Sequence, residues 1–382
     1  VMRHNRITLV FFLAMTVFTG WLFGYMPKGF LPNDDTGQIL AITEGAQDIG
    51  FEALAEKQQQ AAQLLQQNPY VDTAMAFVGT SSGSANQGRI FSRLKPSDER
   101  PSSTEVIQQL RPTMMSIPGF KVFLQNIPVI RFGGSLSKAQ YQFALQDADI
   151  EELYYWAPLL AEKVKTLPGF LDVSSDLQIA LPKVMLDIDR DKASALGLTQ
   201  EQIESALYGA YGSRQVSTIY TSSNQYSVIM ELKPEFQRDP TALGMLQVRS
   251  SNGTLVPLNS VAEFTRTIGP LSVAHVGQLP AVNLSFNLKP GYALGDAIAA
   301  FNKARAELKV PDTVIGSFQG AAQAFQSSFS GMGLLLLSAV LVIYLVLGIL
   351  YESFKHPITI LSGLPTAALG ALLTLLLFKV EM

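Results

Sequence analysis

The sequence predicts an α+β membrane protein in which three transmembrane helices carry a large extramembrane region. Two observations support this fold class. Three long runs, over residues 7–23, 332–351 and 358–378, are apolar and contain no charged residue. Between the first and the second run, segments in which apolar and polar residues alternate, as in strands, follow one another with segments typical of helices. In keeping with this, only 15% of the 382 residues are charged, against about 25% in ordinary soluble proteins.

Each apolar run is long enough to cross a bilayer as a helix, and we expect transmembrane helices over residues 7–25, 331–351 and 358–379. A cleaved signal peptide is the alternative for the first run, although its apolar part exceeds the roughly 7–15 residues of such peptides. Arg3 and Arg6 precede the first run, and Lys355 and His356 lie between the other two. The positive-inside tendency therefore places residues 27–330 on the side of the membrane opposite the cytoplasm.

The extramembrane region begins with a recognisable order of elements. We expect strands over residues 37–43, 72–78, 89–94 and 121–125, and helices over 51–67 and 102–115. The order β-α-β-β-α-β is that of the split βαβ, or ferredoxin-like, motif. The pattern recurs with a strand over 141–146 and a helix over 150–166, and later with a helix over 293–308 and a strand over 313–318. Several small α/β sandwiches are therefore predicted.

Composition excludes several classes of function. With 28 basic and 31 acidic residues there is no basic field for a nucleic acid, so none is expected as a partner. The chain has no cysteine, and its three histidines are far apart, which argues against a zinc site. No nucleophile elbow or HExxH motif is present, so an enzyme is not expected.

Two residue clusters suggest metal ligands but have simpler explanations. Asp187, Asp189 and Asp191 alternate along a strand, yet Asp191 is expected to open a helix, where a solvated cap is the ordinary role. Met114 and Met115 offer thioethers for a soft ion, but adjacent residues of a helix face different ways. No metal ligands are therefore predicted.

Four stretches carry a resemblance to a known family. They are FLPNDDTG at residues 30–37, the strand and helix over 185–212, GQLPAVNLSF at 277–286 and LYESFKHP at 350–357. In order and spacing the chain resembles the second half of a resistance–nodulation–division (RND) multidrug efflux pump of the hydrophobe/amphiphile exporter branch. The chain is then expected to be a fragment of such a pump.

The resemblance implies a division into subdomains. Residues 32–133 would form a first porter subdomain, residues 134–180 together with 272–323 a second one, and residues 181–271 an inserted docking subdomain for an outer-membrane channel. Such pumps are trimers in the inner membrane of Gram-negative bacteria, built from one kind of subunit or from two related kinds. They act with a periplasmic membrane-fusion adaptor and an outer-membrane channel, as antiporters driven by the proton gradient. The family's proton relay lies on helices that this chain does not include, so no relay residue and no cofactor is assigned.

The resemblance also implies a binding site for amphiphilic small molecules. The family's pocket strands match this sequence at Met75, Phe77, Val78, Phe91, Phe123, Gln125 and Ile127, with Phe132 nearby. The family's switch loop matches Gly79, Thr80, Ser81, Ser82, Gly83 and Gly88. This loop lacks the family's phenylalanine, and Gln125 stands where an aromatic residue is expected, so a more polar pocket is predicted. Strand alternation leaves open whether Phe77, Phe91 and Phe123 line a site or belong to the core.

Three other functions stay open from the residues. An ATP-driven permease can also have one span, a large extramembrane domain and further spans, and the missing P-loop is neutral because its ATPase can be separate. A metal-ion exporter of the same superfamily is a second alternative. A membrane-anchored sensor is a third, but the short link at residues 352–356 leaves no room for an output domain.

Overall fold

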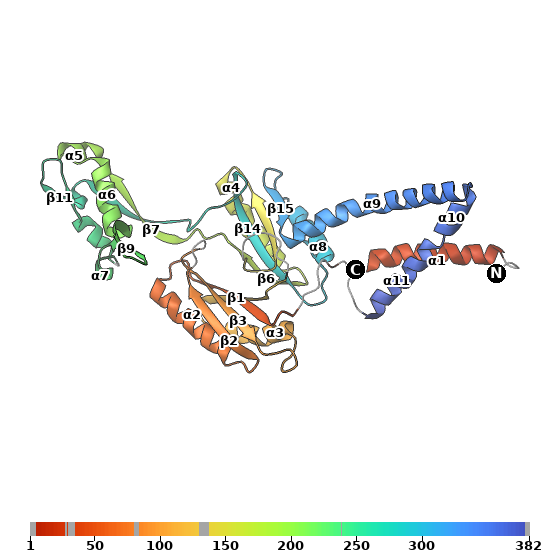
Figure 1. Cartoon of the computed structure of the whole chain (residues 1–382). Helices are drawn as coiled ribbons and strands as arrows, with labels where there is room; N and C mark the ends of the chain where they lie inside the picture. Colours follow the sequence, from red (N-terminus) through yellow and green to blue (C-terminus); the bar gives the residue numbers. More distant parts are fainter. Residues whose placement is uncertain are drawn as a thin grey trace. The chain divides into compact units, whose positions relative to one another are not determined.

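The computed structural model describes residues 5–26, 29, 35–79, 84–129, 137–237 and 239–378. The chain forms two compact units. One is discontinuous and comprises Val1–Gln178 and Ser272–Met382, and the other is the inserted unit Ile179–Leu271. Figure 1 follows the elements of both along the chain.

The first part of the discontinuous unit is a four-stranded antiparallel sheet with two helices, here called the first sandwich. Its elements are β1 (Gln38–Gly45), α2 (Phe51–Gln66), β2 (Val71–Val78), β3 (Gln87–Leu94), α3 (Ser103–Met114) and β4 (Phe120–Asn126). The strand order is β2-β3-β1-β4, so the two crossover helices cover the same face (Figure 1). The predicted β-α-β-β-α-β order of elements is therefore found, with ends that differ by one or two residues.

The core of the first sandwich lies between the sheet and the two helices. Leu54, Ala61 and Leu65 form the buried stripe of α2, because residues three, four and seven apart share one helix face. They pack against alternate residues of the strands, among them Ile39 and Ile90. Met114, at the end of α3, is also in this core, whereas Met115 is 74% exposed. The two methionines thus face different ways, as predicted.

The start of α3 is fixed by a polar network that the sequence did not reveal. Ser102 caps the helix and accepts from the Glu105 amide, and Asp35 accepts from the Ser103 amide at 2.8 Å. The guanidinium of Arg100, almost fully buried, donates two hydrogen bonds of 2.7 Å to the Asp35 carboxylate. These hydrogen bonds from Arg100 hold the pKa of Asp35 well below its usual range.

The second part of the discontinuous unit repeats this arrangement and is called the second sandwich. It contains β5 (Tyr141–Gln146), α4 (Ile150–Lys165), β6 (Phe170–Ser175), β14 (Leu279–Leu288), α8 (Leu294–Glu307) and β15 (Ile315–Gln319). The short strand β13 (Ala274–Val276) also pairs with β14. The antiparallel order β6-β14-β5-β15 is that of the first sheet, although the inserted unit separates β6 from β14 in sequence. Its core is aromatic, with Phe143 tilted against Phe301 and edge-to-face with Phe318 at centroid distances of 4.4 and 4.8 Å.

The inserted unit is entered and left through a two-stranded ribbon of β7 (Leu181–Ile188) and β12 (Ala262–Gly269). It contains the helices α5 (Arg190–Ala195), α6 (Gln200–Tyr211) and α7 (Pro234–Gln237). Its other strands are β8 (Arg214–Tyr220) and β9 (Gln225–Met230), which form an antiparallel hairpin, and β10 (Gln247–Arg249) and β11 (Leu255–Pro257). The 3-10 helices η2 (Pro240–Met245) and η3 (Leu258–Ser260) complete it.

Two helices of the inserted unit begin at polar caps. At the start of α6, Thr199 and Gln202 form a capping box with both reciprocal hydrogen bonds present. The expected cap at Asp191 is wrong by two residues, since Asp189 is the N-cap of α5 and accepts from the Lys192 amide at 3.0 Å. Asp191 instead lies in the first turn, where its charge favours the helix dipole.

The apolar runs form the helices α1 (Asn5–Tyr25), α9 (Ala321–Leu350), α10 (Lys355–Leu361) and α11 (Leu364–Phe378). By length and composition two helical segments of the described residues can cross a membrane, Ala321–Leu350 and Lys355–Phe378, and the apolar helix Leu9–Tyr25 is shorter. The helix predicted over 331–351 starts earlier, because no proline or charge interrupts the chain after Gly320. Helix α1 packs on α11 through Leu22, Leu369 and Leu372, and the Thr19 hydroxyl donates to the Pro365 carbonyl at 3.2 Å.

Candidate functional site

The first sheet has a second apolar face, directed away from α2 and α3, which we call the outer face. Strand alternation and the pairing register place two rows of side chains on it. One row runs Met75, Phe91, Leu40, Gln125 across β2, β3, β1 and β4, and the next runs Phe77, Arg89, Ile42, Phe123. Most of the residues expected to bind substrate therefore share one surface.

The outer face is covered at one side and open at the other. Leu40, Ile42 and Phe123 on the central strand and on β4 form a buried cluster, with Phe91 and Ile127 packed against it. On the edge strand β2, by contrast, Met75 is 62% and Phe77 47% exposed. Phe77 meets Phe91 edge-to-face at a centroid distance of 6.0 Å, a favoured aromatic geometry. The open side thus presents an aromatic pair and a flexible thioether next to a preformed apolar floor.

A buried glutamine fixes the strands that carry the open side. Gln58 of α2 is 1% exposed and lies on the helix side of the sheet. Its amide nitrogen donates to the carbonyls of Phe77 and Arg89, at 3.1 and 3.0 Å, and its oxygen accepts from the Thr43 hydroxyl at 2.6 Å. Gly88 leaves room for this network, because a Cβ there would lie 2.7 Å from the Phe77 carbonyl oxygen. One side chain therefore holds β2 and β3 together where Phe77 and Arg89 project.

Gln125 of β4 contacts the chain that leads to the second sandwich, and Ile127 just after β4 contacts the chain before β1. Gln125, expected as a polar element of the pocket, donates from its amide to the Ser137 carbonyl at 2.8 Å. The Ile127 carbonyl accepts from the Thr36 hydroxyl at 3.2 Å. One function of the Gln125 side chain is thus to hold the segment after residue 136 against the sheet.

Charged residues surround the outer face. Glu44, at the end of β1, pairs with Lys138 and lies 3.9 Å from the Lys121 ammonium. Lys138 also donates to the Ser175 carbonyl of the second sandwich at 3.0 Å. At the other end of the sheet Arg93 pairs with Asp72 at 2.6 Å. Both carboxylates are therefore already bound by cations.

The remaining predicted site residues lie elsewhere. Val78 points to the helix-side core, because it follows Phe77 and strand alternation sends it to the other face. Gly88 is part of β3, not of the loop, and pairs with Val78 and Thr43. Gly79 has a φ of +73°, which favours glycine, and follows β2 directly. Thr80, Ser81, Ser82, Gly83 and Phe132 lie outside the described residues.

Three residues of the site are not among those that the sequence predicts. Leu40 and Ile42 belong to the outer face, and Gln58 holds its strands. A signal for the first two existed, because the run Ile39–Ile42 is apolar without alternation, as in strands buried on both faces. Gln58 is one of three consecutive glutamines in a polar helix, so its sequence gives no hint of burial.

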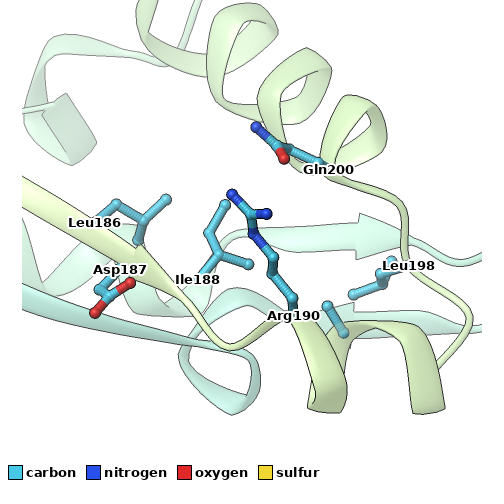
Figure 2. A pocket seen from close by; sticks show the side chains of 7 residues that line it. Leu186, Asp187, Ile188, Arg190, Leu198 and Gln200 are labelled. Atoms are coloured by element: carbon cyan, nitrogen blue, oxygen red, sulfur yellow. The ribbon is translucent and has the colours of Figure 1, made fainter.

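The inserted unit holds a separate hollow of about 380 Å³. It is lined by Leu186, Asp187, Ile188, Arg190, Ala193, Leu198 and Gln200. Figure 2 shows the Arg190 side chain crossing the hollow toward the start of α6 at Gln200, whereas the Asp187 carboxylate points away from it. In the described part of the chain, no group of three or more histidine, cysteine, aspartate or glutamate residues is placed to hold a metal ion.

The chain matches the AcrB/AcrD/AcrF family over residues 1–382. It belongs to this family. The match confirms the resemblance to RND efflux transporters that the four sequence stretches indicated. Membership of an inner-membrane family also agrees with the long apolar helices, and supports association with a membrane.

Solved structures share the fold. A crystal structure of a heavy metal efflux pump, crystal form II, superposes with a TM-score of 0.88 at 20% sequence identity. Crystal form I of a heavy metal efflux pump gives a TM-score of 0.85 at 21% identity. These matches cover 99% and 98% of this chain but 40% of each matched chain. The likeness therefore extends over nearly all of this chain and less than half the length of those proteins.

Proposed function

We propose that this chain supplies porter and membrane segments of a proton-driven efflux pump that exports drugs and other amphiphilic small molecules. The observation that carries the proposal is the outer face of the first sheet. It combines a buried apolar floor at Leu40, Ile42 and Phe123 with exposed Phe77 and Met75 at its open side. Within a family of efflux transporters, such a surface is suited to bind apolar molecules of different shapes.

The physical basis is the burial of apolar area, which contributes about 25 cal/mol per Å² without directional demands. The aromatic pair adds edge and face contacts to ring systems. A methionine such as Met75 adapts to several shapes because its unbranched side chain has three rotatable bonds. The face therefore offers affinity for amphiphiles without requiring one fixed hydrogen-bond pattern.

The same proposal includes the assembly and the subdomains. Both sandwiches have the element order of ferredoxin-like domains, and we assign them to the two porter subdomains and the inserted unit to docking on an outer-membrane channel. The chain would act in a trimer, in the inner membrane of a Gram-negative bacterium, with a periplasmic adaptor. Residues of α1, α9 and α10–α11 would form three of its transmembrane helices. Proton coupling would reside outside these residues.

Export of heavy metal ions is the second candidate, favoured by the described activity of the proteins with the same fold. A sequence identity of 20% supports a common fold, but the substrate has to be inferred from the residues of the site itself. The outer face argues for amphiphiles, since its two rows carry one sulfur atom and no carboxylate or imidazole. Cu(I) and similar soft ions prefer several thiolate or thioether ligands.

The test expresses the complete transporter that contains this chain, with its adaptor and channel, in cells that lack their own RND pumps. Accumulation of a lipophilic dye and of zinc, copper and silver ions is measured with and without a protonophore. We expect lower dye accumulation, restored by the protonophore at constant ATP, and unchanged metal content. Lower metal content with unchanged dye would overturn the proposal in favour of metal export, and export that follows ATP alone would indicate an ATP-driven permease.

A further inference from the structure

One positively charged side chain, that of Arg89, lies among the apolar residues of the outer face. Arg89 of β3 is half-buried, and the register sets it directly opposite Phe77 of β2 on one side and Ile42 of β1 on the other. Directly opposed residues of antiparallel strands have Cβ atoms about 4.5–5.5 Å apart. The Arg89 side chain therefore leaves the sheet between the exposed Phe77 of one neighbouring strand and the buried floor residue Ile42 of the other.

The carboxylates near this face are bound to other cations. Glu44 pairs with Lys138 and Lys121, and Asp72 pairs with Arg93. Within the described ranges, no carboxylate lies within 4.0 Å of the Arg89 guanidinium. Four cations thus face two carboxylates around the outer face, and Arg89 carries a positive charge that the described protein groups do not pair.

A guanidinium in such a place selects its ligand by charge. Arginine stays protonated at all physiological pH values and presents a planar fork of donors that matches a carboxylate, sulfate or phosphate group. Hydrogen bonds between two charged groups are stronger than neutral ones, and they strengthen further where apolar groups exclude water. A cationic ligand in the same place would meet like charge, which adds discrimination.

The positions from which Arg89 and Phe77 project are fixed relative to each other by the backbone. The Gln58 amide donates to the carbonyls of both Phe77 and Arg89, at 3.1 and 3.0 Å, so the two residues are held in register by the same group. Phe77 therefore provides an apolar contact next to the charged contact of Arg89. A molecule with an apolar body and an acidic head can use both at once.

We propose that the substrates of the outer face are anionic amphiphiles, whose acidic head binds Arg89 while the apolar body lies on Phe77 and Met75. This inference rests on the proposed function and specifies the charge of its substrates. It makes Arg89 a specificity-determining residue, distinct from the apolar residues that supply general affinity.

The experiment measures binding of two probes, dodecyl sulfate and dodecyltrimethylammonium, to the complete purified transporter in nanodiscs of phosphatidylcholine. Both probes share one alkyl chain and are used below their critical micelle concentrations. The variants are R89Q, R89K and the matched control R93Q, which removes a cation four residues further along the same strand. Arg93 is a suitable control because its side chain is 66% exposed and already paired with Asp72.

We expect the wild type to bind dodecyl sulfate at least about tenfold more tightly than dodecyltrimethylammonium. R89Q should weaken dodecyl sulfate binding by about 10- to 100-fold, as expected for one charged hydrogen-bonding partner, and leave the cation unchanged or tighter. R89K should retain most of the preference, and R93Q all of it.

Two results would overturn the inference while leaving the proposed function in place. One is equal affinity of the wild type for both probes. This comparison uses no variant, so it does not depend on whether a variant folds correctly. The other is an equal loss of both probes in R89Q. Failure of the proposed function is a different result, in which the wild type binds neither probe.

Discussion

The substitution G88A tests the account of how the outer face is held together. Gly88 is buried in β3, and a Cβ there would lie 2.7 Å from the Phe77 carbonyl oxygen. The same Cβ would lie 2.8 Å from the Gln58 Oε1 atom and 2.8 Å from the Thr43 hydroxyl. Contacts below 3.0 Å are repulsive and one of these atoms is backbone, so the network around Gln58 must shift.

The size of the effect follows from two contributions. Overpacking a dense interior costs about 1–3 kcal/mol. Displacing Gln58 also weakens its hydrogen bonds to the carbonyls of Phe77 and Arg89, and each buried group left unsatisfied costs about 1–3 kcal/mol. A loss of at least about 2 kcal/mol in the local opening free energy of β2 and β3 is therefore expected, which corresponds to about 30-fold faster amide exchange.

Hydrogen exchange with mass spectrometry on the complete transporter measures this loss in peptides covering β2 and β3. The matched control is G50A, since a Cβ on Gly50 meets nothing within 4 Å and its φ of −75° suits alanine. G50A should leave exchange in these strands unchanged. The same exchange rates in G88A and in the wild type would refute the role given to the Gln58 network.

Three further predictions concern the first and second sandwiches. Q58L leaves the Thr43 hydroxyl and two strand carbonyls without their partner, and should weaken binding of anionic and neutral amphiphiles alike, which a binding titration measures. F143A removes a ring that is 1% exposed in the aromatic core and should destabilise the second sandwich by about 3–5 kcal/mol in denaturant unfolding, whereas F51A, at a ring 68% exposed, should change it little. Because Arg100 holds the pKa of Asp35 below its usual range, the stability from this carboxylate is complete above about pH 4, its unfolded-state pKa, and is lost as pH falls toward the lower folded value. D35N should therefore lower stability at pH 7 and flatten the acid limb of an unfolding titration, and an acid limb as steep as that of the wild type would contradict this assignment.

The order of elements could be predicted because local signals decide it. Strands are expected over residues 72–78 and 89–94, and β2 and β3 lie there. The pairing of β6 with β14 could not be predicted from local signals, since 93 inserted residues separate the two parts of the second sandwich, and only the family resemblance joined these parts in one subdomain. Nothing local in either strand specifies a partner so distant in sequence.

The site was predictable by residue type but not by face. A strand places alternate residues on opposite sides, yet its sequence does not say which side the helices cover. Phe77 therefore could not be distinguished from Val78 as a surface residue, and Phe123 could not be identified as buried floor. The role of Gln58 depends on two carbonyls from other elements, which become neighbours only in the folded sheet.

The most direct test of the central claim, that the outer face binds amphiphiles, uses two methionines of the first sandwich. Met75 lies on the outer face and is 62% exposed, while Met115 follows α3 on the opposite side of the sheet and is 74% exposed. This chain contains no cysteine, so M75C and M115C each introduce a single thiol into it. Both variants are made in a complete transporter free of other cysteines and labelled with a maleimide in the presence and absence of an amphiphile.

We predict that dodecyl sulfate slows labelling of M75C at least several-fold and leaves M115C unchanged. Equal labelling of M75C with and without the amphiphile, or equal protection of both thiols, would contradict binding at the outer face.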